Sequence, residues 1–129
     1  MLLGTAKALK EIEDKLTCRV ILLFQPSEEG LQSGAEVMVE NGIMDEIDII
    51  AGMHVEGTMD AGKMGAEDFS RYLQRKPGVF MRIGTRNVEK GITTLAHNND
   101  FMIDEDVLGY GSATMVQFVL DQMELRVKV

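Results

Sequence analysis

Two adjacent glutamates are the first residues in this sequence whose types and placement favour chemistry. Glu28 and Glu29 lie in the stretch FQPSEEG, directly after the apolar run VILLF. Neighbouring carboxylates repel each other unless a positive charge lies beside them. The ends of strands in open α/β sheets are also where binding sites form. The pair therefore favours one carboxylate that holds a metal ion and another that moves a proton.

The two histidines of the chain could complete such a site. His54 comes at the end of a second apolar run, and His97 lies in a polar loop. Two histidines and a glutamate are a common zinc set, in which a fourth position stays open for water. A bound metal lowers the pKa of that water towards about 7, and a nearby carboxylate then takes its proton. We assign Glu29, His54 and His97 as metal ligands and Glu28 as the general base.

Other interpretations of these residues remain open from their types alone. A histidine at a strand end is more often a hydrogen-bonded structural residue, and paired glutamates more often lie on a solvated surface. The long spacings between the three positions carry no pattern such as HExxH. Glu67 is a further candidate for substrate contact, although acids in the first turn of a helix also suit its dipole. Cys18 is expected to be buried and inert.

Periodicity divides the chain into strands and helices that alternate. Continuous apolar runs predict three strands, at residues 18–25, 47–55 and 79–85. Helical spacing and capping residues predict helices at 2–16, 33–41, 66–74 and from 104 onward. Such alternation predicts an α/β fold, with three αβα layers around a short, mainly parallel sheet. Because parallel strands end at one edge, Glu28, Glu29 and His54 should converge there, with the His97 loop above them.

Length and charge narrow the class of protein. The chain has 129 residues, 45% of them hydrophobic, with one cysteine and a net charge of −8. This length predicts a single domain over residues 1–129. An acidic chain is a poor partner for nucleic acid or for an anionic membrane surface. No run approaches the roughly 20 apolar residues that span a bilayer, and no signal peptide is recognisable. We therefore expect a cytoplasmic protein without nucleic-acid or membrane partners.

Five motifs in series resemble one enzyme family. FQPSEEG, GMHV, MGAEDFSRYLQ, PGVFMRIGTRN and LAHNNDFMIDEDVL occur in this order. Together they resemble the metal-dependent amidohydrolases and metallopeptidases, which include hippurate hydrolases, N-acyl-amino-acid deacylases (aminoacylases), related carboxypeptidases and plant auxin-conjugate hydrolases. The resemblance implies a zinc-peptidase-like catalytic domain with Zn²⁺ or Mn²⁺ and a small N-acyl amino acid or peptide substrate. It gives Glu28, Glu29, His54 and His97 the roles assigned above.

The chain also departs from the pattern of that family. The resemblance implies a dinuclear site with five ligands, two of which come from a Cys-Gly-His-Asp-Gly-His stretch that this sequence does not contain. It also implies a lid domain that is missing between about residues 57 and 67. We therefore expect a truncated catalytic domain with impaired or no turnover, whose open edges favour a homo-oligomer.

Two alternatives to an enzyme remain open. The first is a non-catalytic α/β remnant, or an engineered fragment, that self-associates. The second is a nucleotide-binding α/β domain. In that case a glycine-rich phosphate loop should follow the first strand, but Glu28 and Glu29 occupy this position and would repel phosphate.

Overall fold

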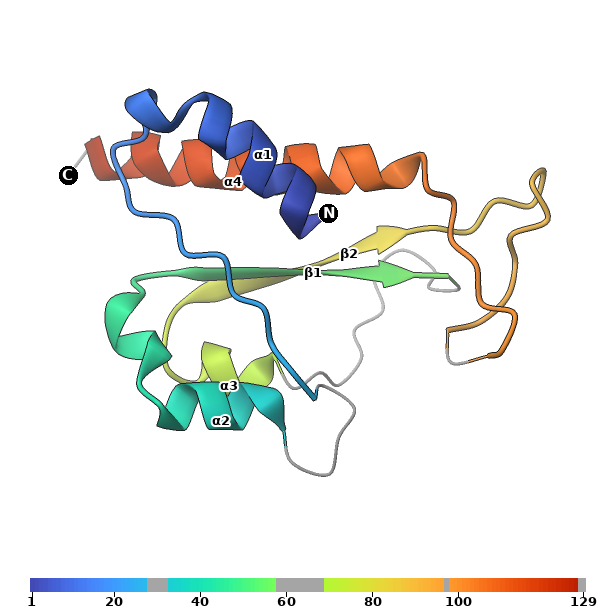
Figure 1. Ribbon diagram of the computed structural model, residues 1–129, viewed down its shortest axis with the longest axis horizontal. Helices are drawn as coiled ribbons and strands as arrows, with labels where there is room; N and C mark the ends of the chain where they lie inside the picture. Colours follow the sequence, from blue (N-terminus) through green and yellow to red (C-terminus); the bar gives the residue numbers. More distant parts are fainter. Residues whose placement is uncertain (28–32, 58–68, 97, 128–129) are drawn as a thin grey trace.

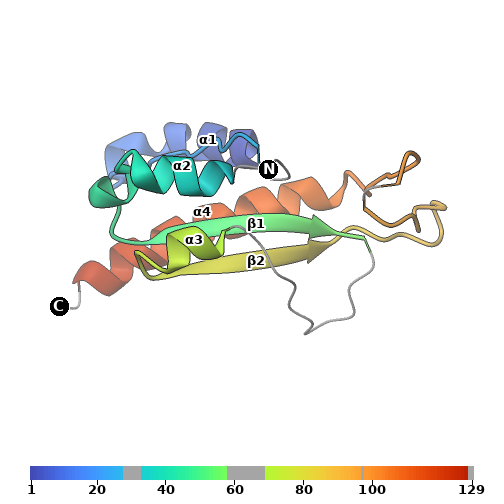
Figure 2. The same ribbon diagram turned by 90° about the horizontal axis from the view of Figure 1, so that it is seen from below.

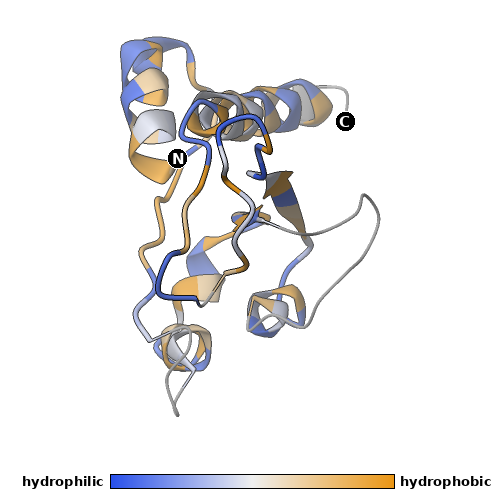
Figure 3. Ribbon diagram, turned by 90° about the vertical axis from the view of Figure 1, so that its right-hand side faces the viewer, coloured by the Kyte–Doolittle hydropathy of each residue, from blue (hydrophilic) through white to orange (hydrophobic). Residues whose placement is uncertain are grey.

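Two parallel strands lie between two layers of helices in the computed structural model of the chain (Figure 1). The strands are β1 (Ile50–Glu56) and β2 (Gly78–Gly84). Figure 3 looks along the strands and shows helical ribbons above and below them. The structure describes residues 1–27, 33–57, 69–96 and 98–127.

Four α-helices form the two outer layers within the described residues. On one face of the sheet, α1 (Leu2–Glu11) packs against α4 (Val107–Val127). On the other face, α2 (Gly34–Glu40) packs against α3 (Ser70–Leu73), and Figure 2 shows α3 in front of the strands with α4 behind them. Short 3₁₀ helices follow α1 and α2, at Glu13–Lys15 and Ile43–Glu46. This is the α/β arrangement with a parallel sheet that the alternation of elements predicts.

The register of the sheet is fixed by backbone bonds at both of its ends. Ile50 pairs with Gly78 and Glu56 pairs with Gly84. The Ile50 amide donates to the Pro77 carbonyl at 3.1 Å, and the Thr85 amide donates to the Glu56 carbonyl at 3.1 Å. The predicted strands at 47–55 and 79–85 are confirmed, with boundaries displaced by one to three residues.

Local signals set the bounds of the helices. The Ser33 hydroxyl accepts a hydrogen bond from the Glu36 amide at 3.2 Å, which is the predicted N-cap of α2. Gly42 follows this helix with a φ of 82°, a left-handed conformation that glycine adopts at little cost. The last helix begins at Val107 rather than Asp104, because Asp104 to Asp106 form a turn ahead of it. No helix within the described residues is long and apolar enough to cross a membrane.

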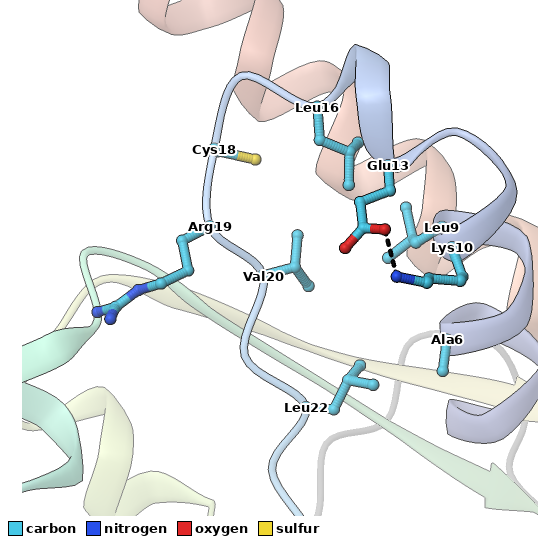
Figure 4. Close-up of a pocket in the computed structure, with 9 residues that line it drawn as sticks. All are labelled: Ala6, Leu9, Lys10, Glu13, Leu16, Cys18, Arg19, Val20 and Leu22. Carbon is cyan, nitrogen blue, oxygen red and sulfur yellow. Dashed lines mark hydrogen bonds and ion pairs between the residues drawn. The ribbon is translucent and has the colours of Figure 1, made fainter.

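The prediction of a strand at residues 18–25 is wrong. These residues are extended, but among the described residues no backbone hydrogen bond joins them to β1. Their side chains nevertheless alternate as in a strand. Cys18, Val20 and Leu22 point towards α1, where they line a hollow of about 350 Å³ (Figure 4). Ile21 and Leu23 pack on the opposite side, against the core of the α2–α3 layer. Partial burial against two layers therefore accounts for most of the apolar run without strand pairing, although Phe24 is 60% exposed.

A larger cavity separates this extended segment from β1. It measures about 700 Å³ and is lined by residues 17–23 and 25 on one side and by residues 46–54 on the other. Helices α1 and α4 border it above the sheet, through residues that include Leu9, Phe118 and Val119. Phe69, Tyr72 and Phe80 border it below. We call this space the interstrand cavity.

A cluster of buried hydrophobic residues lies between β1 and the α2–α3 layer. Ala35, Met44, Ile50, Phe69 and Tyr72 are among its buried members. Tyr72 is only 1% exposed, and its ring meets that of Phe69 edge-on with 5.6 Å between the centroids. This core fixes β1 relative to the helices beneath it, and therefore fixes the position of His54.

Lys90 links the loop after β2 to the residues just before α4. Lys90 Nζ donates to the carboxylates of Asp104 at 2.7 Å and Asp106 at 2.5 Å. Asn87 also donates to Asp104, at 2.6 Å, and the Asp104 amide donates to the Thr85 carbonyl at 3.1 Å. Asp104 is 8% exposed, so its charge needs these partners.

This network makes the stability of the protein depend on pH at both extremes. The hydrogen bond from Lys90, followed by that from Asn87, lowers the pKa of Asp104 below its usual 3.8. The ionised Asp104 therefore stabilises the fold at pH values above its usual pKa of 3.8. This contribution is lost as the pH falls from 3.8 through the lowered pKa of the folded protein. The hydrogen bonds to Asp104 and Asp106 raise the pKa of Lys90 above 10.5, so its contribution is lost as the pH rises beyond that value.

We expect the thermal unfolding midpoint, Tm, to fall as the pH is lowered into the acid range. This acid limb of the Tm profile should be smaller in an Asp104→Asn variant. The measurement is Tm against pH from about 2 to 7, with Asp121→Asn on the exposed side of α4 as the control. An acid limb of equal size in wild type and Asp104→Asn would contradict this assignment.

Candidate functional site

His54 is the one predicted catalytic or metal-binding residue that lies within the described part of the chain. It is half-buried near the end of β1 and pairs in register with Arg82 of β2. Because side chains alternate along a strand, His54 lies on the same face of the sheet as Gly52. A Cβ added at Gly52 would meet the ring of Phe69, which identifies this face. Its ring lies 6.3 Å from that of Phe80, centroid to centroid. The side chain therefore stands on the α2–α3 face of the sheet.

The imidazole of His54 is oriented by its own backbone. Its Nδ1 lies 2.5 Å from the carbonyl oxygen of Val55. A carbonyl only accepts, so Nδ1 carries the proton and the lone pair of the neutral ring lies on Nε2. Metal-binding histidines commonly show this arrangement, because a bond to the other nitrogen fixes the tautomer. The donor atom that His54 presents thus fits a divalent cation.

An ion pair beside His54 is a feature that sequence reasoning missed. Arg82 donates to the Glu56 carboxylate at 3.2 Å, and both side chains are about 20% exposed. The guanidinium also lies 5.8 Å from the centre of the Phe80 ring. A lone cation inside the apolar strand VFMRIG was the available signal, but it needed the register of β1 and β2 to become informative. The pair brings both signs of charge to the face that carries His54.

The chain turns sharply just before the glutamate pair. Ser27 has a φ of 51°, which is unusual for a residue other than glycine. Its carbonyl accepts from the Gly34 amide at 3.3 Å, and a Cβ at Gly34 would collide with the Pro26 carbonyl oxygen. This hydrogen bond joins Ser27 to Gly34, the first residue of α2.

The remaining predicted site residues lie outside the described residues. These are Glu28, Glu29, Glu67 and His97. Within the described part of the chain, no three His, Cys, Asp or Glu side chains gather as a metal-holding group. The convergence of the glutamate pair with His54 therefore stays a prediction. Cys18 is half-buried with a free thiol, less buried than expected.

Comparison with known proteins places these residues in a wider context. The family described as Peptidase family M20/M25/M40 matches residues 1–65. An N-acyl-L-amino acid amidohydrolase of Geobacillus stearothermophilus is 42% identical over 65 residues, which cover 50% of this chain and 18% of that protein. An IAA-amino acid hydrolase of Arabidopsis thaliana, ILR1-like 6, is 37% identical over 95 residues, or 74% of this chain and 20% of that protein.

A third relative comes from an archaeon. Thermostable carboxypeptidase 2 of Saccharolobus solfataricus is 51% identical over 49 residues, covering 38% of this chain and 12% of that protein. The chain thus spans a fifth or less of the length of the curated relatives it matches. No solved structure matches the chain.

Proposed function

This chain belongs to peptidase family M20/M25/M40, and from that membership we propose that its site hydrolyses amide bonds in N-acyl amino acids or small peptides with a bound metal ion. The observation that carries the proposal is the match over residues 1–65, because this half of the chain contains both FQPSEEG and GMHV. The names of the relatives, an amidohydrolase of N-acyl amino acids among them, support this substrate class.

Three side chains would hold the metal ion. We propose Glu29, His54 and His97, with Zn²⁺ or Mn²⁺ as the ion, and the Nε2 lone pair of His54 supports this set. The ion would polarise the amide carbonyl and lower the pKa of a water molecule. Glu28 would take the proton from that water and later deliver it to the leaving amine.

The described residues around His54 leave substrate contact open. Arg82 and its ion-pair partner Glu56 place both signs of charge on the face that carries His54. Glu67 remains a further candidate for substrate contact. Precise positioning contributes several orders of magnitude to hydrolysis, so a site without a lid should turn over slowly.

Three statements about the whole chain belong to the same proposal. Residues 1–129 would form one catalytic-type α/β unit of the zinc-peptidase kind, in which a short segment at about 57–67 stands in place of the lid domain. The chain would self-associate through open sheet edges. It would act in the cytoplasm on a small-molecule substrate.

Metal binding is the first test of the proposed site. We expect the metal-stripped chain to bind about one equivalent of Zn²⁺ or Mn²⁺ in calorimetry. Three protein ligands define such a site, so His54→Ala should weaken this binding by at least about a hundredfold. The control is Glu124→Ala, which removes an exposed carboxylate of α4. Equal metal affinity in His54→Ala would contradict the assignment, and no binding by the wild type would favour the non-catalytic remnant.

A further inference from the structure

The chain between β2 and α4 is closed at its base. The Asp104 amide donates to the Thr85 carbonyl at 3.1 Å, so the backbone just before α4 returns to the end of β2. Asn87 spans the same base, because its Nδ2 donates to the Asp104 carboxylate at 2.6 Å. Residues 86–103, which we call the β2–α4 loop, therefore leave and rejoin the fold at one place. In the sequence, His97 belongs to this loop.

A tight turn presents Lys90 to the base of the loop. The backbones of Asn87 and Ile92 exchange two hydrogen bonds of 2.8 Å across this turn. The Asn87 side-chain oxygen also accepts from the Lys90 amide at 3.1 Å. Lys90 Nζ then donates to the carboxylates of Asp104 at 2.7 Å and Asp106 at 2.5 Å. One side chain thus connects the turn to the residues that begin α4.

The far part of the β2–α4 loop packs against the end of β1. Gly57 is buried, directly follows β1, and is the third residue after His54. A Cβ added at Gly57 would lie 3.1 Å from the Thr94 carbonyl oxygen and 3.7 Å from the ring of Phe101. Thr94 precedes position 97 and Phe101 follows it. The loop therefore meets the strand that carries His54 on both sides of position 97.

Short-range hydrogen bonds keep this part of the loop together. The Asn98 amide donates to the Leu95 carbonyl at 3.4 Å, and the Asn98 side chain donates to the same carbonyl at 3.2 Å. The Phe101 amide donates to the Asn98 carbonyl at 3.0 Å. Because these bonds link residues before and after position 97, a displacement at the base should move this part of the loop as a unit.

Lys90 contributes more to the loop than to the core. Its side chain is 46% exposed, and that of Asp106 is 81% exposed. Ion pairs with such exposure contribute little to global stability. The buried Asp104 keeps its hydrogen bond from Asn87 when Lys90 is removed. Loss of Lys90 should therefore loosen the base of the loop and leave the core folded.

We propose that Lys90 is a positioning residue for the metal site, because it holds the β2–α4 loop where this loop meets the end of β1. The inference rests on the proposed function, which assigns His54 and His97 as ligands from these two segments. A ligand on a loop needs supporting contacts that keep it within about 0.5 Å of its productive position. Lys90 supplies this support from the base of the loop and contacts neither the ion nor the substrate.

Calorimetry on the full, metal-stripped chain tests this role. Lys90→Met keeps the length of the side chain but removes its charge, so we expect the affinity for Zn²⁺ or Mn²⁺ to fall at least about tenfold. Lys90→Arg keeps the charge and should restore most of the affinity. The matched control is Lys10→Met, which removes an exposed ion pair with Glu13 on α1. It should leave the metal affinity unchanged.

A measurement without metal follows the loop itself. Nitroxide labels on Leu95→Cys and Glu124→Cys, in a Cys18→Ser background, report the distance between the β2–α4 loop and α4 by pulsed electron paramagnetic resonance. Both labelled positions are exposed. We expect the distance distribution to be about twofold broader in Lys90→Met, since loss of local contacts promotes local opening. It should keep its wild-type width in Lys10→Met.

The outcomes separate this inference from the proposed function. If the wild type binds the ion and Lys90→Met binds it equally well, the inference is overturned and the proposed function stands. If the wild type binds no ion, both are overturned, and a broader distribution in Lys90→Met would assign Lys90 to the loop alone. Asp106→Asn is the second variant, because it removes one partner of Lys90 and leaves the buried Asp104 paired. It should show a smaller loss of affinity, and equal losses in Lys10→Met would also overturn the inference.

Discussion

Replacing Tyr72 by alanine is expected to lower the free energy of unfolding by about 3–5 kcal/mol, the usual cost of deleting a buried aromatic ring. Tyr72 is 1% exposed and packs edge-on against Phe69. Its hydroxyl donates to Gln25 at 2.9 Å and contacts Met38 Sδ at 3.4 Å. Because small domains are stable by only about 5–15 kcal/mol, this change should bring the chain close to unfolding. Urea unfolding followed by circular dichroism measures it.

Tyr72→Phe is the matched control for that experiment. It keeps the ring in the core and removes only the hydroxyl, so we expect a loss of about 0.5–1.5 kcal/mol. A cost for Tyr72→Ala no larger than that for Tyr72→Phe would mean that the ring contributes little, which would contradict its place in the buried hydrophobic cluster.

The Glu28→Gln variant is expected to hydrolyse N-acyl amino acids about 100- to 10,000-fold more slowly than the wild type in the presence of metal. This factor is the usual contribution of a general base to the rate. Glutamine preserves the shape of the side chain but cannot take a proton. The ligand set does not include Glu28, so metal affinity should change little. Release of free amino acid, measured with and without added Zn²⁺ or Mn²⁺, gives the rates.

Glu29→Gln separates the two glutamates. Because Glu29 is an assigned ligand, the Glu29→Gln variant should lose both metal affinity and turnover. The Glu28→Gln variant should lose turnover alone. Glu124→Gln removes an exposed carboxylate elsewhere and should leave both quantities unchanged. Metal-dependent turnover that survives in Glu28→Gln would rule out the assigned mechanism, and metal-independent turnover in the wild type would rule out the metal-dependent reaction itself.

Local signals in the sequence predicted much of the fold. Ser33 and Glu36 form the expected cap, and Gly42 ends the helix that they begin. Both strands of the sheet also match their apolar runs. In each case the signal is local, either a side chain that bonds to a nearby amide or a run of apolar residues with a fixed period.

The strand predicted at residues 18–25 was wrong for a physical reason. An apolar run reports that both faces of a segment are buried, but it does not report where the backbone groups bond. Ile21 and Leu23 are packed against the lower layer while Val20 and Leu22 contact the upper one, and these contacts satisfy the pattern without a ladder. Strand pairing depends on distant parts of the chain, which no local pattern encodes.

The residue types of the candidate site could be proposed from the sequence, whereas its surroundings could not. His54 was proposed from its place at the end of an apolar run, and its role stays a prediction. The pairing of Arg82 with Glu56 was not, because these residues are 26 positions apart and meet only through the register of two strands. The resemblance to a family supplied the roles of Glu28, Glu29 and His97, which residue types alone left open.

The interstrand cavity also gives the protein an unusual mechanical property. Protein interiors are normally close-packed, so they compress little. Those parts of the space beside β1 that solvent does not fill are volume that disappears when the chain unfolds. Hydrostatic pressure favours whichever state occupies the smaller total volume, and here that state is the unfolded one. The fold should therefore be more sensitive to pressure than a close-packed domain of the same size.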